Sequence, residues 1–212
     1  MLPSNALTER LGLAYPIIQA PMAGATTPAL AAEVSEAGAL GSLGLGTSTA
    51  EAAAAEIQHF RQMSAKALNA NFFCHDEPGD VTGTGEKMRR RLAPFYQEHN
   101  AGDVPLPSVP YGTFTADHAA MLAVEKPAVV SFHFGLPEEA LLEQVRATGA
   151  FILCSATTVA EARALEIAGV DAIIAQGLEA GGHRGTFLGA DIAHQPGLFA
   201  LLAFHAEIAR VR

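Results

Sequence analysis

The stretch AVVSFHFGLPEEALLEQVRATGAFILCSATTVAEARALEIAGVDAIIAQG, residues 128–177, alternates short apolar runs with helical segments. The runs of strand length are 128–135, 150–156 and 171–177, and the helical segments between them are 137–149 and 158–169. Thr158 and Glu161 have the spacing of a capping box at the start of the second helix. Strands that alternate with helices predict parallel βαβ units with right-handed crossovers. We therefore expect an α/β protein.

The rest of the chain repeats this alternation. Further strands are expected at 15–21, 39–46 and 66–73, and further helices at 27–38, 48–63, about 87–99, 117–126 and 196–212. About six βα units with nearly apolar strands suit either an open doubly wound sheet or an incomplete (β/α)8 barrel of the TIM type, whose full form has about 250 residues. We expect one domain over residues 1–212, with a long insertion at about 74–114.

The composition of the 212 residues restricts the class of function. Half of the residues are hydrophobic and the formal net charge is −9, while the basic run KMRRR at 87–91 is short, so we expect no nucleic-acid partner. Cys74 and Cys154 lie far apart and form no CxxC pair, so neither a disulfide framework nor a metal site is expected. The sequence shows neither a signal-peptide pattern nor an apolar run of membrane-spanning length, which predicts a cytoplasmic protein without a membrane partner.

Polar residues follow the predicted strands at their carboxyl ends, where α/β proteins place their sites. His133 ends the fourth strand, and an imidazole titrates near neutrality. Gln176 ends the sixth strand and offers both donors and acceptors to a planar heterocycle. Gly181 and Gly182 follow it and leave their backbone N–H groups accessible to a ligand. We interpret this edge as a ligand site, the alternatives being a structural histidine and a flexible glycine loop.

Two further residues are expected at the same edge. Asn71 lies near the end of the third strand, and Met22 follows the first. The nearby GSLGLG at 41–46 has the spacing G-x-x-G-x-G rather than the dinucleotide-binding G-x-G-x-x-G, so it predicts close backbone packing at a strand end.

Four motifs give the chain a resemblance to a known family: YPIIQAPMAG at 15–24, NANFF at 69–73, SFHFGLP at 131–137 and SATTVAEARALEIAGVDAIIAQGLEAGGHRG at 155–185. With them the chain resembles the class I nitronate monooxygenases, formerly called 2-nitropropane dioxygenases. The resemblance implies a TIM barrel with non-covalent FMN. It also implies oxidation of alkyl nitronates such as propionate 3-nitronate with O2 to carbonyl compounds, with nitrite or nitrate as the other product.

The resemblance also assigns roles to residues. His133 matches the active-site histidine of the family, which acts as a base toward neutral nitroalkanes and as a partner for the anionic nitronate. Asn71, Gln176 and Gly181 match flavin-contacting positions, with Gly182 beside them, and Met22 matches the first-strand loop against the cofactor.

Family members continue with two more βα units that hold the FMN phosphate, so the resemblance implies a C-terminally truncated chain. Two alternatives stay open at this point. One is an FMN-dependent enoyl-thioester reductase on a related barrel, and the other is a non-catalytic fragment. The physiological substrate and the oligomeric state are not indicated by the sequence.

Overall fold

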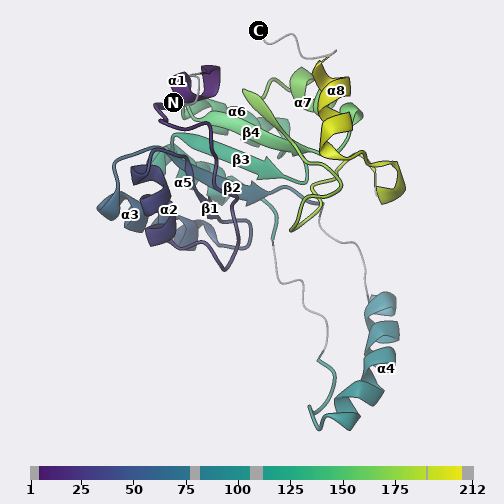
Figure 1. Cartoon of the computed structure of the whole chain (residues 1–212). Helices are drawn as coiled ribbons and strands as arrows, with labels where there is room; N and C mark the ends of the chain where they lie inside the picture. Colours follow the sequence, from purple (N-terminus) through teal and green to yellow (C-terminus); the bar gives the residue numbers. More distant parts are fainter. Residues whose placement is uncertain (1–4, 77–81, 106–111, 190, 207–212) are drawn as a thin grey trace. The chain divides into compact units, whose positions relative to one another are not determined.

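The computed structural model describes residues 5–76, 82–105, 112–189 and 191–206 (Figure 1). The chain divides into two compact units. The main unit comprises residues 1–75 and 113–212, and the insertion unit comprises Asp76–Gly112. The insertion unit falls within the expected insertion at about 74–114.

The main unit contains a parallel sheet whose strands are β1 (Gly41–Gly44), β2 (Leu68–Phe73), β3 (Val129–His133), β4 (Phe151–Ala156) and β5 (Ala172–Ala175). Its described helices are α1 (Ala6–Leu11), α2 (Pro28–Glu36), α3 (Ala50–Met63), α5 (Ala116–Glu125), α6 (Glu139–Ala147), α7 (Val159–Ile167), the 3-10 helix η1 (Ile192–His194) and α8 (Leu198–Ala206). The insertion unit contains α4 (Thr82–Glu98), and Arg89 Nε donates to the carbonyl oxygen of Val104 at 3.1 Å within it.

The strand order decides between the two architectures that the alternation of strands and helices left open, and it confirms the barrel that the resemblance implies. The strands follow one another as β1-β2-β3-β4-β5, and every pair is parallel. A doubly wound sheet reverses its order at a switch point, whereas a barrel does not. The fold is therefore of the TIM-barrel type, with the barrel not closed among the described residues.

The distribution of apolar side chains agrees with this architecture. One face of the sheet packs against α2, α3, α5, α6 and α7 in a large core that includes Phe72, Phe132 and Ile152 (Figure 1). The opposite, inward face carries a smaller cluster of Leu40, Val129 and Leu153, which lies toward the amino ends of the strands. Successive side chains of a strand point to opposite faces, so Asn71, Ser131, His133 and Ser155 lie on the inward face, opposite the large core.

The first expected strand, 15–21, is reduced to one parallel bridge between Ile18 and Leu40. Pro16 and Pro21 stand at its two ends and have no N–H group for a sheet ladder. The backbone N–H groups of Ala14 and Tyr15 instead donate to the carbonyl oxygen of Gly38. The prediction of a full strand was therefore wrong.

The other predicted strands and helices are present with shifted ends, whereas α1 and η1 were not predicted. The described part of the last expected helix, 196–212, is α8, and residues 207–212 lie outside the described residues. Across the described ranges, no helix combines the length and the apolar character that a membrane crossing requires.

Candidate active site at the carboxyl ends of the strands

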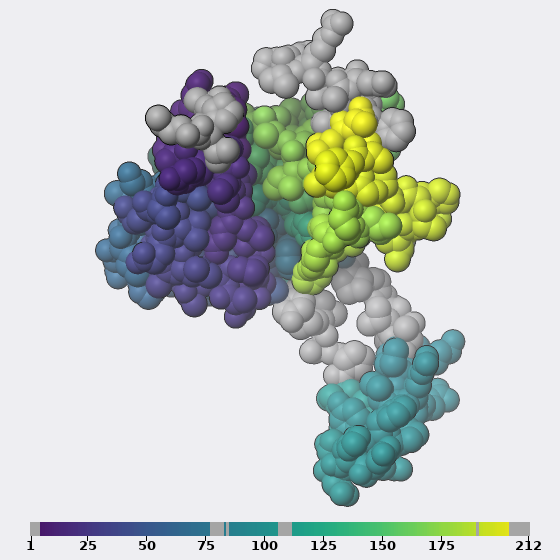
Figure 2. Space-filling view, viewed as in Figure 1, coloured from purple at the N-terminus to yellow at the C-terminus, as the bar shows by residue number. Residues whose placement is uncertain are grey.

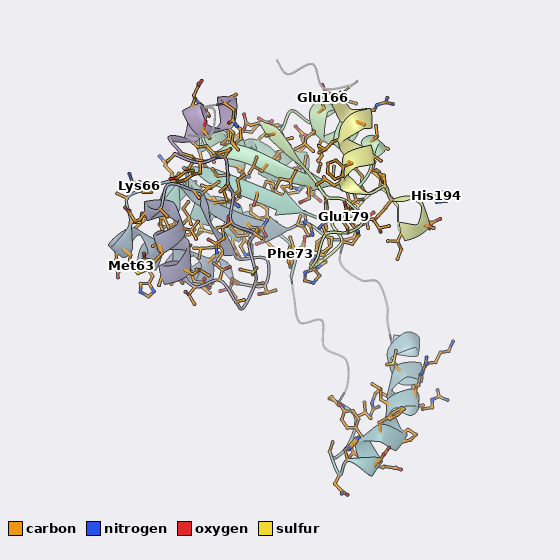
Figure 3. The ribbon with its side chains drawn as sticks, in the orientation of Figure 1. Met63, Lys66, Phe73, Glu166, Glu179 and His194 are labelled. Carbon is orange, nitrogen blue, oxygen red and sulfur yellow. The ribbon has the colours of Figure 1, made fainter. Side chains whose placement is uncertain are left out.

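Polar side chains cross the inward face of the sheet toward the carboxyl ends of its strands. Register aligns Gly44 with Asn71, Asn71 with Ser131, and Phe73 with His133. β1 to β4 carry their inward polar residues at alternate positions of otherwise apolar runs, so these side chains face the same side. Figure 2 shows the main unit hollowed between its N-terminal part and the segment that follows β5. In Figure 3, Lys66 and Phe73 mark the two ends of β2, with Phe73 at the carboxyl edge.

His133 ends β3, and both of its ring nitrogens have partners. Nε2 lies 3.1 Å from the carbonyl oxygen of His183, and Nδ1 lies 2.9 Å from Oγ of Ser155. A carbonyl oxygen can only accept, so Nε2 carries the proton. In the neutral ring Nδ1 then accepts the hydroxyl proton of Ser155. The geometry therefore selects the tautomer with the proton on Nε2.

Burial lowers the pKa of His133 below the ordinary histidine value, and the nearby His183 side chain lowers it further. The hydrogen bond to the backbone of His183 acts in the opposite direction and raises this pKa. Burial is the largest of the three effects, so the imidazole is neutral at pH 7.

Gln176 lies beside His133 and contacts the same backbone segment, residues 177–189, which we call the glycine loop. Nε2 of Gln176 donates to the carbonyl oxygen of His183 at 2.8 Å, so this oxygen accepts from both Gln176 and His133. Oε1 of Gln176 accepts from the N–H group of Gly185 at 2.7 Å. The Arg184 guanidinium donates to the carbonyl oxygen of Gly177 at 2.6 Å and holds the start of the loop.

The other predicted site residues take separate positions along the edge. Gly181 and Gly182 lie in the exposed part of the glycine loop, with no heavy atom within 4 Å of the place where a Cβ would stand. Asn71 is 6% exposed and its Nδ2 donates to Oγ of Ser131 at 2.9 Å. Met22 is 43% exposed and adjoins the end of β1, because a Cβ on Gly44 would lie 2.8 Å from its carbonyl carbon. The structure thus brings His133 and Gln176 together through their shared acceptor, the carbonyl oxygen of His183, whereas Met22 forms no hydrogen bond with either side chain in the described part of the chain.

Aromatic rings surround the His133 imidazole. The ring of Phe134 lies 4.6 Å from it and the ring of Phe73 lies 6.0 Å away, measured between centroids. The His183 ring contacts both phenylalanines, at 5.4 Å from Phe73 and 5.8 Å from Phe134. Phe134 has a φ of 68°, a left-handed conformation that is rare for a bulky residue and that concentrates at functional sites.

Several residues of this site were missed by sequence reasoning. Ser131 and Ser155 bind Asn71 and His133, and their signal was available: each is a polar residue at an alternate position of a buried strand. Arg184 and Glu161 act through backbone groups of a loop, and no spacing in the sequence marks such contacts.

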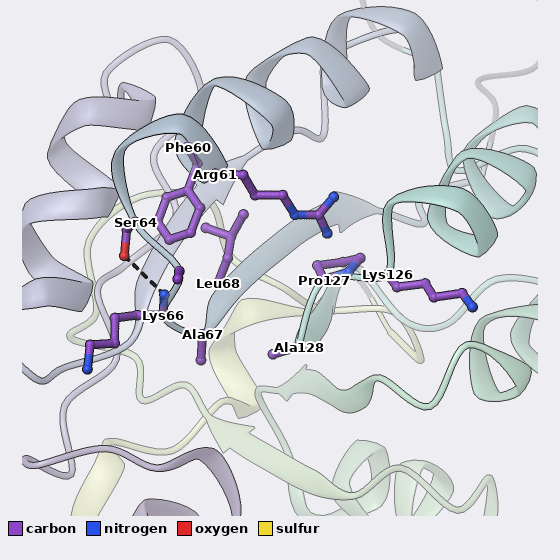
Figure 4. A pocket seen from close by; sticks show the side chains of 10 residues that line it. Phe60, Arg61, Ser64, Lys66, Ala67, Leu68, Lys126, Pro127 and Ala128 are labelled. Atoms are coloured by element: carbon purple, nitrogen blue, oxygen red, sulfur yellow. Dashed lines mark hydrogen bonds between the residues drawn. The ribbon is translucent and has the colours of Figure 1, made fainter.

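The cavity of about 540 Å³ shown in Figure 4 lies elsewhere. It is lined by residues that precede β2 and β3, including Lys66, Ala67, Pro127 and Ala128, and by the end of α3. It therefore opens at the amino ends of the strands. Barrel enzymes carry out their chemistry at the opposite end, where His133 lies.

Comparisons with known proteins support one family. A family model described as nitronate monooxygenase matches residues 4–211. The nitronate monooxygenase of Paraburkholderia phytofirmans is 46% identical over 210 residues, which cover 98% of this chain and 57% of that protein. That of Pseudomonas aeruginosa is 45% identical over 188 residues, covering 87% and 53%. The chain thus spans little more than half the length of these relatives.

Solved structures agree with the sequence relatives. The nitroalkane oxidase of Streptomyces ansochromogenes superimposes with a TM-score of 0.86 at 38% identity, over 98% of this chain and 59% of that one. FabK from Thermotoga maritima gives 0.67 at 25% identity, over 97% and 51%. The family model and the curated relatives both match almost the whole of the described fold, the carboxyl edge with His133 included, and the chain belongs to the nitronate monooxygenase family.

Proposed function

We propose that this chain is the substrate-contacting and flavin-contacting part of an FMN-dependent enzyme. It oxidises alkyl nitronates of the propionate 3-nitronate type with O2 to carbonyl compounds, with release of nitrite or nitrate. Family membership supports the reaction class. The observation that carries the choice of substrate is the N–H group of His133 Nε2, which is directed at a carbonyl oxygen at the carboxyl edge of the sheet.

The chemistry of that N–H group favours an anionic substrate. A nitronate distributes one negative charge over two oxygens, and hydrogen bonds to ionised acceptors are roughly twice as strong as neutral ones. A nitronate oxygen would therefore replace the carbonyl oxygen of His183 as the acceptor. The remaining lone pair of the imidazole, at Nδ1, already accepts from Ser155. This arrangement supports binding of a preformed anion more directly than removal of a proton from a neutral nitroalkane.

The same edge offers groups that fit the isoalloxazine ring of FMN. The open space around Gly181 and Gly182 lets a flat ring approach their backbone. Bound FMN would supply the electron-transfer chemistry, while these residues would bind and orient it.

The proposal is tested on the purified protein with FMN added. Retention of a flavin absorbance band, followed by anaerobic bleaching with propionate 3-nitronate and by O2 consumption in air, is the expected result. A colourless protein that consumes no O2 with the nitronate would overturn the proposal. The alternative, an FMN-dependent enoyl-thioester reductase, predicts instead a rapid anaerobic bleaching by NADH, and the fragment alternative predicts no flavin retention.

We also infer a cytoplasmic location. Cys74 and Cys154 are both free thiols, as is usual in a reducing compartment. Cell fractionation with a flavin or antibody signal checks this inference, and recovery in an exported fraction would contradict it.

A further inference from the structure

Glu161 is a buried carboxylate with an unusual number of donors. It lies in the first turn of α7 and is 1% exposed. Its Oε2 accepts from the N–H and the hydroxyl group of Thr157, both at 2.7 Å. Its Oε1 accepts from the N–H groups of Phe187 at 2.8 Å and Leu188 at 3.2 Å, and from the hydroxyl of Thr186 at 3.1 Å. One side chain therefore ties the end of β4 to the glycine loop.

This pattern differs from an ordinary helix cap. The spacing of Thr158 and Glu161 predicts a capping box, in which the carboxylate would return to the N–H group of Thr158. The Thr158 side chain does accept from the N–H group of Glu161 at 3.2 Å. The carboxylate, however, binds Thr157 and the loop. Stabilising the helix alone would require none of the loop contacts.

The loop segment that Glu161 holds packs directly against the active-site edge. Gly185 precedes it, and a Cβ on Gly185 would lie 2.5 Å from Cε1 of His133. Phe187 packs on Gly135, where a Cβ would lie 3.2 Å from its ring. The glycine loop therefore touches His133 through Gly185 and the turn after β3 through Phe187.

We infer that Glu161 is a positioning residue, which fixes the glycine loop on His133 so that the imidazole and the loop backbone keep one relative geometry. The inference deepens the proposed function, and its consequence for turnover rests on that function. The placement of the loop does not depend on the proposed function, and it can be measured without substrate.

Ionisation of Glu161 matters to this role. Burial on its own raises the pKa of its carboxyl group, but the hydrogen bonds from Phe187, Thr157 and Leu188 lower it, and the net direction is downward. All of these partners are donors, so they stabilise the anion. Glutamine has nearly the same shape but presents an N–H₂ group to donors on one side, so Glu161→Gln breaks one half of the bridge.

The test compares Glu161→Gln with a control, Glu166→Gln, because Glu166 is exposed on the same helix. We expect the amide hydrogens of Phe187 and Leu188 to exchange with solvent roughly 10- to 100-fold faster in Glu161→Gln. The reason is that both N–H groups lose a hydrogen bond to a charged carboxylate, which is stronger than one to a neutral group. The imidazole NMR signals of His133 should move in that variant and stay unchanged in Glu166→Gln. Amide exchange in β2 and β3 should not change, which separates loop release from general loss of structure.

Unchanged exchange at Phe187 and Leu188 together with unmoved His133 signals would overturn the inference, as would equal acceleration throughout the sheet. If Glu161→Gln does not fold, Glu161→Asp takes its place, because it keeps the charge near Thr157 but withdraws it from the loop by roughly one bond length, about 1.5 Å. Faster exchange confined to the loop supports the inference, and exchange equal to wild type refutes it. A released loop in a protein that never retains FMN would leave the positioning role intact and reject the proposed function.

Discussion

Adding one methyl group at Gly185 should separate the glycine loop from His133. A Cβ at this position would lie 2.5 Å from Cε1 and 2.8 Å from Nδ1 of the imidazole. Carbon atoms pack at about 3.5–4.0 Å, so the ring or the loop must move by roughly 1 Å. Gly185 has no positive φ, so its backbone accepts alanine and the clash alone is responsible.

Neither side of this contact can yield at low cost. The imidazole is held by Ser155 and by the carbonyl oxygen of His183, and the loop is held by Gln176. Overpacking of this kind costs typically about 1–3 kcal/mol in the free energy of unfolding. A displacement of about 1 Å at a reacting geometry can reduce the rate on the order of 100-fold. We expect Gly185→Ala to fold with reduced stability and to lose about that factor in kcat/KM for propionate 3-nitronate.

The assay combines thermal unfolding, O2 consumption with the nitronate, and the NMR signal of the His133 Nε2 proton. Gly189→Ala is the matched control, because it lies in the same loop, has no positive φ and has no heavy atom within 4 Å of the added Cβ. Gly185→Ala with wild-type kcat/KM and an unmoved Nε2 proton signal would refute the reasoning. An equal loss of kcat/KM in Gly189→Ala would show that any substitution in the loop reduces activity. The contact between Gly185 and His133 would then not explain the effect.

Three further predictions concern His133. His133→Asn should retain FMN but slow turnover of neutral nitroethane by about 10²–10⁴-fold, because it removes the imidazole that would act as the base once Nδ1 is released from Ser155. Nitronate turnover should slow less, because the amide still donates a hydrogen bond. Unchanged nitroethane oxidation would remove His133 from the mechanism. Ser155→Ala removes the donor to Nδ1 and should raise the pKa of His133, as followed by NMR titration, and a fall in that pKa would contradict the assigned tautomer. The pKa of an unfolded histidine is about 6.5, and the pKa of folded His133 is lower. Its contribution to the free energy of unfolding is therefore complete above about pH 6.5 and is lost as the pH falls through the folded pKa. Over that pH window, denaturant unfolding should show a steeper fall in the free energy of unfolding for wild type than for His133→Asn.

The sequence predicted the elements of the fold better than their assembly. Hydrophobic runs and helix ends located the strands β1 to β5 because burial on both faces requires unbroken apolar residues. The strand at 15–21 failed because its two prolines cannot donate to a ladder, although its apolar pattern is strand-like. The choice between a doubly wound sheet and a barrel depends on strand order, which a local pattern does not contain.

The candidate site also has a part that the sequence predicts and a part that it does not. Residues at strand ends, such as His133 and Gln176, could be predicted, because parallel strands bring their carboxyl ends to one edge. The loop contacts could not, because the carbonyl oxygen of His183 and the N–H groups that bind Glu161 belong to the backbone, which every residue has. Only the fold decides which backbone groups face a site.

The backbone contact on His133 explains why an imidazole stands at the end of this strand. In this half-buried, aromatic surrounding, partial burial disfavours the charged ring and lowers the pKa of His133. A neutral histidine still presents one N–H donor, and here that donor is aimed by Ser155 from behind and by a carbonyl oxygen in front. A carbonyl oxygen is a weaker acceptor than an anionic oxygen, so an arriving anion can take its place. An asparagine at position 133 would donate a hydrogen bond but would lack a group that titrates, so under the proposed function histidine combines a displaceable donor with a nitrogen that can accept a proton.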